Sequence, residues 1–578
     1  MLDFSNVNSL WSSVLVETLV SLGLKLAVVC PGSRSTPLTV ALARHPQLEV
    51  IPILDERSAA FFALGRAKRL HGPVVLVCTS GTAAANFFPA IIEAKESQVP
   101  LLVLTADRPP HLRHCHAGQT IDQFKLYGAY PQWQTELALP SADLMALQYL
   151  RQTLAYAWER TIYPRSGVVH LNCPFTEPLA PIPDPSIQSL GPAFPQANFF
   201  RHLSSKTGMS VSDSLIELPS LPAGGLIVAG LYQGPEPETY ATLIADLAQG
   251  LNYPVLSDAL SPLRHRFRGD YSLVTGYDFI LRSPSAQAAL QPSCVLQIGE
   301  LPTSKQLRNW LNSLAVPRYI LDPTGENFDP LHGSVRSLRC SLPALVAALR
   351  PQFSNVRADN YPQQWQAYED QTQALLHKAL LHRDTLAESN LMPHLAQGLP
   401  PETVLMVANS MPVRYMEFFW PRTQQKYEIY FNRGANGIDG TLSTALGLAH
   451  RDWPTVLLTG DLSLLHDSNG FLLGPLFQGS LTIILVNNQG GGIFEMLPIT
   501  QFSEVFERYF ATPQVIDFAQ LCRTYGVAHH VIASLPALEQ ALALDFPPGI
   551  RVWEIASNRR EEAQWLQQLM GQFETIQW

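Results

Sequence analysis

Short apolar runs of strand length alternate with helical stretches along almost the whole chain, and this alternation constrains the fold more than any other feature. The runs Lys25–Cys30, Val74–Cys78 and Pro100–Thr105 each have the length of a buried strand, and the stretch Ala83–Lys95 has helical character. Strand, helix and strand at this spacing indicate a parallel sheet covered by helices. We therefore expect an α/β fold built from doubly wound parallel sheets.

The same alternation recurs twice, which divides the 578 residues into three α/β units. A second unit begins at Gly225–Gly230 and a third near Thr403, and units of roughly 150–200 residues agree with the usual size of a domain. The stretch Pro174–Pro195 is rich in Pro and Ser, and we interpret it as a linker. The predicted domains are 1–185, 195–355 and 360–578, without an evident repeat between them.

The composition limits the class of protein. A net charge of −9 argues against a general nucleic-acid or anionic-membrane binder, because phosphate groups bind to positive surfaces. The N-terminal segment shows no signal-peptide pattern, and apolar runs such as Leu481–Val486 are far shorter than the roughly 20 residues that span a bilayer. The seven cysteines include no CxxC pair, which fits reduced thiols. We expect a cytoplasmic, multidomain protein.

The third unit carries the most specific chemical motif. One predicted strand, Thr455–Thr459, runs into Gly460 and Asp461, and the next runs into Asn487–Gly490. Both segments are expected at the carboxyl ends of adjacent strands, where open α/β sheets bind ligands. A carboxylate and an amide oxygen brought together there suit a hard divalent cation such as Mg²⁺. Asp and Asn are also common in ordinary strand-end turns, so the prediction depends on the two segments together.

This pair of segments resembles the Gly-Asp…Asn motif of thiamine-diphosphate enzymes. The resemblance implies that Asp461, Asn488 and the backbone carbonyl of Gly490 bind Mg²⁺, or Mn²⁺, against the diphosphate of the cofactor. It also implies three α/β domains of that enzyme class: a pyrimidine-binding domain, a central domain and a diphosphate-binding domain. The remaining cofactor-binding positions that it implies are Glu56, Ile438, Gly460, Gly491, Ile493 and Phe494.

Glu56 is the predicted acid–base residue. Enzymes of this class need a glutamate that hydrogen-bonds the aminopyrimidine ring, because protonating one side of the ring makes the exocyclic amine basic enough to remove the thiazolium proton. Here the predicted strand Val50–Leu54 runs into Asp55 and Glu56, in the first unit and before a helix. Taken alone, Glu56 is an ordinary acid at a helix N-terminus. The presence of the metal motif in the same chain, together with the position of Glu56 in the first unit and before a helix, favours the catalytic interpretation.

A finer resemblance, to the MenD family of 2-succinyl-5-enolpyruvyl-6-hydroxy-3-cyclohexene-1-carboxylate synthases, spans nearly the whole chain. Its motifs follow in order at Pro31–Pro37, Asp55–Phe61, Thr105–Pro109, Gln119–Gln123, Asn409–Arg414, Asn432–Gly440 and Gly491–Phe494. The resemblance implies decarboxylation of 2-oxoglutarate and addition of the succinyl unit to isochorismate, in menaquinone or phylloquinone biosynthesis. It also implies a homodimer or homotetramer whose active sites take Glu56 from one chain and Asp461 from another.

The substrate-contacting positions of that family fall mostly on cationic residues. Both substrates are dicarboxylates, and the planar fork of Arg matches a carboxylate. For any single Arg, a surface salt bridge is the ordinary interpretation. The resemblance assigns 2-oxoglutarate to Ser410, Arg414 and Arg433, and isochorismate to Arg34, Arg108, Gln119 and Lys305.

Two positions depart from the family pattern. Gln306 follows Lys305 where a second cationic residue is expected, and Gly118 stands where some relatives carry Asn. Both departures bear on affinity for isochorismate. The run His111–His116 contains three His and a Cys, but it has no second ligand pair at zinc-site spacing, so we interpret it as a loop.

Two alternatives of different kinds remain open from sequence. One is a thiamine-diphosphate carboligase or decarboxylase that acts on another 2-oxo acid such as pyruvate, against which the cationic series counts. The other is a non-catalytic protein that has kept the fold, against which Glu56, Asp461 and Asn488 count together. The central unit lacks GxGxxG and the phosphate-loop lysine motif, so we interpret it as a structural or regulatory module.

Overall fold

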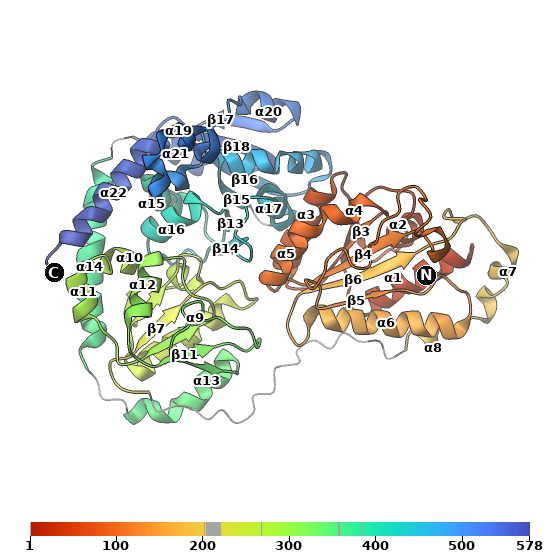
Figure 1. The fold of residues 1–578 in the computed structure, drawn as a ribbon, viewed down its shortest axis with the longest axis horizontal. Helices are drawn as coiled ribbons and strands as arrows, with labels where there is room; N and C mark the ends of the chain where they lie inside the picture. The colour runs from red at the N-terminus through yellow and green to blue at the C-terminus, as the bar shows by residue number, and fades with distance from the viewer. Residues whose placement is uncertain are drawn as a thin grey trace. The chain divides into compact units, whose positions relative to one another are not determined.

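The computed structural model describes residues 2–201, 203, 221–267, 269–355, 359–383, 385–452 and 454–578. These residues form three sheets of six strands, and all neighbouring strands within them are parallel (Figure 1). The chain folds as two compact units, one made of Met1–Met209, Asn432–Asp452 and His466–Gly479, the other of Ser210–Phe431, Trp453–Leu465 and Ser480–Trp578. The predicted α/β fold with parallel sheets is confirmed.

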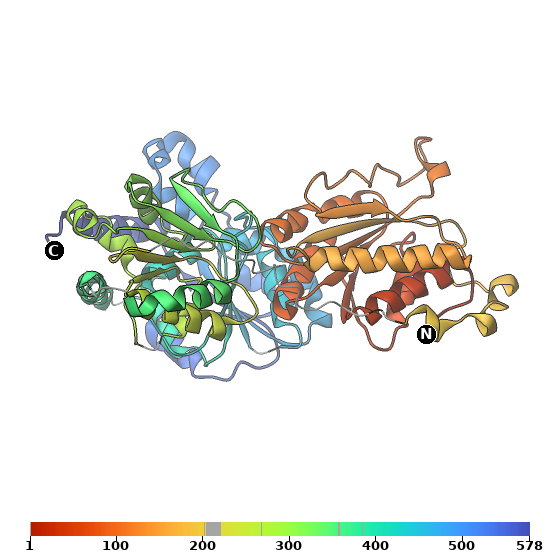
Figure 2. The same ribbon diagram turned by 90° about the horizontal axis from the view of Figure 1, so that it is seen from below.

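The first sheet has the strand order β2-β1-β3-β4-β6-β5. One face packs on α1 (Val7–Ser21), α2 (Thr36–Ala43) and α6 (Leu144–Ile162), which bury the apolar core of this unit (Figure 2). The other face meets α3 (Glu56–Leu70) and α5 (Phe88–Glu96). Its strands are β1 (Leu26–Val29), β2 (Glu49–Pro52), β3 (Val74–Cys78), β4 (Leu101–Asp107), β5 (Trp133–Glu136) and β6 (Val168–Pro174).

Two local predictions in the first unit are wrong. The helix expected over Ala83–Lys95 is two helices, α4 (Thr82–Asn86) and α5, which meet at Phe87. The Pro-rich stretch Pro174–Pro195 is not an open linker, because Phe175, Leu179 and Ile187 are buried in the core of the first sheet. It contains the short helix α7 (Pro185–Gln188). The prolines end regular structure there without preventing the apolar side chains between them from packing.

The central sheet has the order β12-β11-β10-β7-β8-β9, so the chain changes direction across the sheet between β7 and β10. α9 (Pro237–Leu251) and α13 (Leu342–Leu349) cover one face, and α12 (Lys305–Ser313) and α14 (Tyr361–Leu381) cover the other. The strands are β7 (Leu226–Ala229), β8 (Val255–Ser257), β9 (Leu273–Val274), β10 (Val295–Ile298), β11 (Arg318–Leu321) and β12 (Val335–Leu338).

The third sheet repeats the strand order of the first, with β14-β13-β15-β16-β18-β17 in place of β2-β1-β3-β4-β6-β5. α15 (Glu388–Gly398), α16 (Met411–Phe419), α21 (Leu535–Leu542) and α22 (Arg559–Thr575) pack on one face of it. Its strands are β13 (Val404–Val407), β14 (Glu428–Phe431), β15 (Thr455–Gly460), β16 (Ser480–Asn487), β17 (Ala528–Val531) and β18 (Gly549–Ala556).

Helix α17 (Thr441–Ala449) belongs to the first compact unit, where it packs against α3. Two glycines allow the backbones to approach. A Cβ on Gly65 would lie 2.1 Å from the carbonyl oxygen of Thr444, and one on Gly447 would lie 2.2 Å from that of Phe62.

Among the described residues, no helix combines the length and the apolar character needed to cross a membrane.

Candidate active site

The predicted site residues follow the carboxyl ends of strands in all three sheets. In the first and third sheets the strand order reverses between β1 and β3 and between β13 and β15, and ligands bind at such points of open α/β sheets. The loops at these points carry predicted residues on both sheets. Arg34 follows β1, Glu56 follows β2, Arg108 follows β4, Lys305 follows β10, Ser410 follows β13, Arg433 follows β14, Asp461 follows β15 and Asn488 follows β16.

Asp461 and Gly490 are held together at the ends of neighbouring strands. β15 and β16 pair directly, with Gly460 opposite Val486, which brings the two predicted segments to one edge of the sheet. The amide N–H of Gly490 donates to Asp461 Oδ2 over 2.8 Å. Asp461 is only 3% exposed, and burial raises its pKa to about 6. A buried carboxylate with so little solvent gains from a nearby cation.

Asn488 offers an oxygen to the same place. Its side-chain Nδ2 donates to Glu388 Oε1 over 2.8 Å, which leaves Oδ1 as the free end of the amide. Oδ1 is buried and has no hydrogen-bond partner among the described residues. Such a buried acceptor is costly unless a ligand satisfies it, and a divalent cation with oxygen ligands does so. The residues present therefore fit the implied cation.

Glycines shape the rest of this edge. Gly490 has φ +135°, and a Cβ there would lie 2.3 Å from the carbonyl oxygen of Ala511, so the position requires glycine. The N–H of Gly491 donates to the same carbonyl over 2.8 Å. A Cβ on Gly460 would meet no atom within 4 Å, so the chain leaves open space there. Ile493 and Phe494 follow in a half-buried 3₁₀ turn, Gly492–Met496.

Glu56 is the first residue of α3 and is half-buried. Asp55 caps this helix by accepting from the N–H of Arg57 over 2.9 Å, and it also accepts from Asn469 Nδ2 over 2.7 Å. Burial, followed by the charge of Glu56, raises the pKa of the Cys30 thiol, so Glu56 lies near the end of β1. A cavity of about 700 Å³ with mostly apolar walls, bordered by Asp55, adjoins this helix start.

Arg34, Arg108 and Gln119 are brought together around the loop after β3. The guanidinium of Arg108 donates to Ser80 Oγ, and Gln119 Nε2 donates to the carbonyl oxygen of Ser80 over 2.7 Å. Arg34 is 8% exposed and donates to the carbonyl of Phe175 over 3.0 Å. Burial, and then the charge of Arg108, lowers the pKa of Arg34. Arg34 Nη2 lies 3.3 Å from the carboxylate of Glu177, and an anionic substrate would add a second partner for these two cations.

Ser410 and Arg414 share the first turn of α16. Ser410 caps the helix with φ +74°, and the guanidinium of Arg414 donates to its carbonyl oxygen over 2.6 Å. Lys305 begins α12 in the central sheet with an exposed side chain. The structure therefore brings Ser410 and Arg414 into direct contact on one helix, whereas Lys305 begins a helix of a different sheet.

A buried carboxylate binds the backbone of the loop that contains Arg433 and Ile438. Glu93 of α5 is 3% exposed and accepts from the N–H groups of Gly434, over 3.0 Å, and Ala435, over 2.7 Å. Arg433 and Ile438 are both half-buried. Glu93 thus fixes the backbone between them.

The histidine-rich run after β4 remains an exposed loop. His111, His114 and His116 are all exposed. Within the described ranges, no group of three or more His, Cys, Asp or Glu residues is arranged to hold a metal ion.

Comparisons with known proteins agree on one family. A synthase of Microcystis aeruginosa, named 2-succinyl-5-enolpyruvyl-6-hydroxy-3-cyclohexene-1-carboxylate synthase, is 56% identical over 98% of this chain and 99% of its own. Proteins of the same name from Gloeothece citriformis and Synechocystis sp. are each 53% identical over 99% of both chains. This chain belongs to that synthase family. The predicted resemblance to this family is confirmed.

Domain models and a solved structure place the synthase within a wider class. The model described as "Thiamine pyrophosphate enzyme, N-terminal TPP binding domain" matches residues 11–126, and "Middle domain of thiamine pyrophosphate" matches residues 220–407. The crystal structure of benzoylformate decarboxylase from Polynucleobacter necessarius superposes with a TM-score of 0.65, covering 95% of this chain and 98% of that one at 16% identity. The synthase is a thiamine-diphosphate-dependent enzyme (thiamine pyrophosphate is the same compound) with that fold.

Sequence reasoning missed two residues that support the candidate site of this synthase. Glu388 accepts from Asn488, and burial raises its pKa to about 7 while the hydrogen bond from Asn488 acts in the opposite direction. Glu93 accepts from the loop after Arg433. Each lies far along the chain from the residue that it supports, and no local motif marks either of them.

Proposed function

We propose that this synthase uses thiamine diphosphate with Mg²⁺ or Mn²⁺ to decarboxylate 2-oxoglutarate and to join the succinyl unit to isochorismate. The product is 2-succinyl-5-enolpyruvyl-6-hydroxy-3-cyclohexene-1-carboxylate, the compound after which the relatives are named. It is an intermediate of menaquinone or phylloquinone biosynthesis. The observation that carries the proposal is the buried Oδ1 of Asn488, which has no hydrogen-bond partner in the described chain. Asn488 directly follows β16, and Asp461 directly follows the neighbouring strand β15. A thiamine-diphosphate enzyme needs a cation site of this composition.

The chain's own residues divide the chemistry. When bound, thiamine diphosphate supplies the nucleophilic carbon and the electron sink that decarboxylation of a 2-oxo acid requires. Asp461, Asn488 Oδ1 and the carbonyl oxygen of Gly490 bind the cation. Glu56 holds a proton against the aminopyrimidine ring, and its half-buried position limits exchange of that proton with water. Ile438, which is half-buried, would contact the bound cofactor through its apolar side chain.

Two cationic groups bind the substrates. Arg34, Arg108 and Gln119, together with Lys305, bind isochorismate, and the contacts with Ser80 support the grouping of Arg108 with Gln119. Ser410, Arg414 and Arg433 bind 2-oxoglutarate. The cationic side chains neutralise carboxylates within a protein of net charge −9, so they also select dicarboxylates over a monocarboxylate such as pyruvate.

We further infer the organisation and location of the enzyme. The domains run over 1–185, 195–355 and 360–578, and each sheet falls within one of them. The assembly is a homodimer or homotetramer whose sites combine Glu56 of one protomer with the partner's Asp461. It acts in the cytoplasm, where the seven cysteines, all in the described ranges and all free thiols, stay reduced.

A CO₂-release assay tests the reaction. Purified enzyme with cofactor and Mg²⁺ receives 2-oxoglutarate or pyruvate, each with and without isochorismate. We expect release from 2-oxoglutarate, with sustained turnover only when isochorismate is present. Equal or faster release from pyruvate would assign the chain to a different carboligase. No cofactor binding at all would favour a non-catalytic protein.

A subunit-exchange experiment tests the shared site. Glu56→Ala and Asp461→Ala enzymes are mixed under conditions that allow exchange, and hybrids are verified by mass. With random exchange half of the dimers are hybrids, each with one intact site, so activity returns to about a quarter of wild type. If each chain built its own site, every site would carry one lesion and no activity would return.

A further inference from the structure

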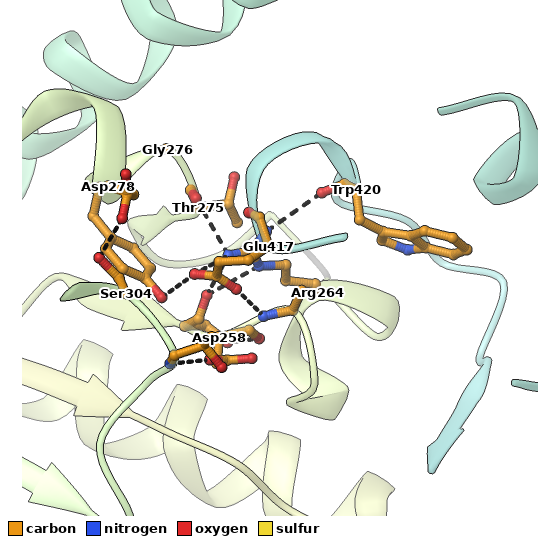
Figure 3. A network of polar contacts seen from close by, with 12 residues as sticks. Asp258, Arg264, Thr275, Gly276, Asp278, Ser304, Glu417 and Trp420 are labelled. Carbon is orange, nitrogen blue, oxygen red and sulfur yellow. Dashed lines mark hydrogen bonds and ion pairs between the residues drawn. The ribbon is translucent and has the colours of Figure 1, made fainter. Parts of the chain in front are cut away.

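A buried polar network joins helix α16 to two loops of the central sheet (Figure 3). We call its four side chains, Asp258, Arg264, Tyr277 and Glu417, the interlock. All four are at most 2% exposed. Glu417 lies on α16, whereas the other three belong to the central sheet's segments after β8 and β9. The interlock therefore connects the helix that begins after Ser410 to a different sheet.

Glu417 is the centre of the interlock. Its Oε2 accepts a hydrogen bond from the N–H of Ala259 over 2.7 Å. Its Oε1 accepts a hydrogen bond from the Tyr277 hydroxyl and lies 3.1 Å from Arg264 Nη2. All three neighbours are donors, so the position requires an acceptor at both carboxylate oxygens. A glutamine at this position would place its NH₂ group against one of these donors, and that hydrogen bond would be lost.

Arg264 binds the C-terminal turn of α16, the helix that carries Glu417. Its Nη1 donates to the carbonyl oxygen of Glu417 over 2.9 Å, in the last turn of α16, where helix carbonyls lack partners within the helix. Its Nε and Nη2 donate to the carbonyl oxygen of Ser257, over 3.0 and 2.8 Å, at the end of β8. A guanidinium at a helix C-terminus is also favoured by the helix dipole. Side chain and backbone of Glu417 are thus both tied to the central sheet.

Asp258 continues the network towards Lys305. Its Oδ2 accepts from the N–H of Thr303 over 2.7 Å, two residues before Lys305. Ser304 donates to Asp278 and caps α12 by accepting from the N–H of Leu307 over 3.1 Å. Because Asp258 and Ala259 are consecutive, one short segment holds the start of α12 on one side and Glu417 on the other.

The interlock is better suited to fixing geometry than to adding stability. Taking an ion pair out of water costs free energy that the attraction between the charges largely offsets, so buried pairs contribute little net stability compared with apolar packing. What they add is one allowed arrangement, because every donor and acceptor must be matched. Here the arrangement fixed is that of the α12 start relative to α16.

We propose that Glu417 and Asp258 are positioning residues that set the spacing between Lys305, on the isochorismate side, and the Ser410–Arg414 turn, on the 2-oxoglutarate side. The central domain then sets the distance between the two groups of substrate-binding residues. This inference rests on the proposed function. Both side chains are buried, and no hydrogen bond or ion pair in the described structure joins either of them to Asp461 or Asn488, so cofactor binding should not depend on them.

The test compares Glu417→Gln and Asp258→Asn with wild type, using KM for each substrate, kcat, and the Kd of thiamine diphosphate from tryptophan fluorescence. We expect Asp258→Asn to raise KM for isochorismate about tenfold and Glu417→Gln to raise both KM values by a similar factor, with the cofactor Kd unchanged. The double variant should show less than the product of the two effects, because both act through one segment. Tyr277→Phe, which removes one hydroxyl, serves if Glu417→Gln does not fold, and should shift both KM values in the same direction.

Asp329→Asn is the matched control. It breaks the ion pair of half-buried Asp329, in the loop after β11, with buried Arg318 of β11, and the described contacts of that pair do not reach α16. It should lower the melting temperature and leave both KM values unchanged. The proposal is overturned if the interlock variants behave like this control, or if their KM changes follow a loss of cofactor affinity. A wild-type enzyme that does not turn over the two substrates would instead reject the proposed function.

Discussion

Asn488 donates its side-chain N–H to Glu388 across 2.8 Å, and this single hydrogen bond decides which end of the amide faces the candidate cation site. With Nδ2 engaged, Oδ1 is the atom left buried without a partner among the described residues. In its ionised form the Glu388 carboxylate only accepts hydrogen bonds, so above its pKa of about 7 it excludes the flipped amide. The orientation of a metal ligand is therefore set by a residue one hundred positions away.

Replacing Glu388 should weaken cation binding. We expect Glu388→Ala to raise the Kd of Mn²⁺ in the cofactor complex roughly 10- to 100-fold, because partners that orient metal ligands typically contribute that much. Glu388→Gln keeps one acceptor oxygen and should recover most of the loss. The measurement is Mn²⁺ titration followed by electron paramagnetic resonance. Glu369→Gln, a buried carboxylate bonded to Thr275, is the control. Wild-type Mn²⁺ affinity in Glu388→Ala would show that the hydrogen bond does not orient Asn488.

Glu56→Gln should bind cofactor but lose most activity, since the amide keeps the shape of the side chain and removes proton transfer. We expect kcat to fall by at least about 100-fold with the cofactor Kd within a few-fold of wild type. Glu159→Gln, on α6 at the opposite face of the first sheet, should leave both values unchanged. A fall in kcat below tenfold, or about 1.4 kcal/mol of barrier, would be too small for the acid–base role.

Arg414→Ala and Arg433→Ala should each lower kcat/KM for 2-oxoglutarate by roughly 100-fold, as expected for the loss of a charge-assisted pair to a carboxylate. Steady-state kinetics at saturating isochorismate measure this effect. Arg350→Ala removes an exposed arginine paired with Asp246 and controls for the change in net charge. If both site variants impaired only the use of isochorismate, the two cationic groups would have to exchange substrates.

His265 should make folding sensitive to acid. Its Nδ1 accepts from Trp420 Nε1 over 3.2 Å and its Nε2 lies 3.1 Å from the carbonyl of Ala259, so the ring is neutral. Burial, together with the charges of Arg266 and Arg264, lowers its pKa to about 3, against about 6.5 when unfolded. Below pH 6.5 the unfolded chain takes up a proton that the folded chain does not, so stability is full above pH 6.5 and falls as the pH falls.

The measurement compares wild type with His265→Gln, which has no titrating group there. Between pH 7.5 and 5.5 the free energy of unfolding of wild type should fall by about 1.4 kcal/mol more than that of the variant, in denaturant titrations. Parallel pH dependence of the two proteins would mean that His265 is protonated in the folded state.

The sequence predicts buried strands well and edge strands poorly. β15 and β16 are continuous apolar runs, and their adjacency follows from the spacing of the two motifs. β5 and β17 lie at sheet edges, are half-buried or exposed, and contain too few apolar residues to stand out. A strand that meets solvent on one side and one face needs no apolar run, so its signal is weak.

The candidate site divides in the same way. Candidate cation ligands such as Asp461 and Asn488 lie in local motifs at strand ends, so the sequence alone could propose them. Glu388 and Glu417 could not, because their partners are defined only after distant segments have packed. A lone glutamate in a helix is typical of a solvated surface. Only the tertiary structure shows that both are buried and accept hydrogen bonds from residues distant in the chain.

The shared strand order of the first and third sheets makes one scaffold appear twice in a single chain. Corresponding loops carry different candidate residues: the loop after β2 carries Glu56 where the loop after β14 carries Arg433, and the loop after β4 carries Arg108 where the loop after β16 carries Asn488. Many doubly wound sheets share such an order, which fixes where the loops leave the sheet and leaves their side chains free to differ. A scaffold that occurs twice therefore offers two sets of loop positions, and the chain uses them for side chains of different charge.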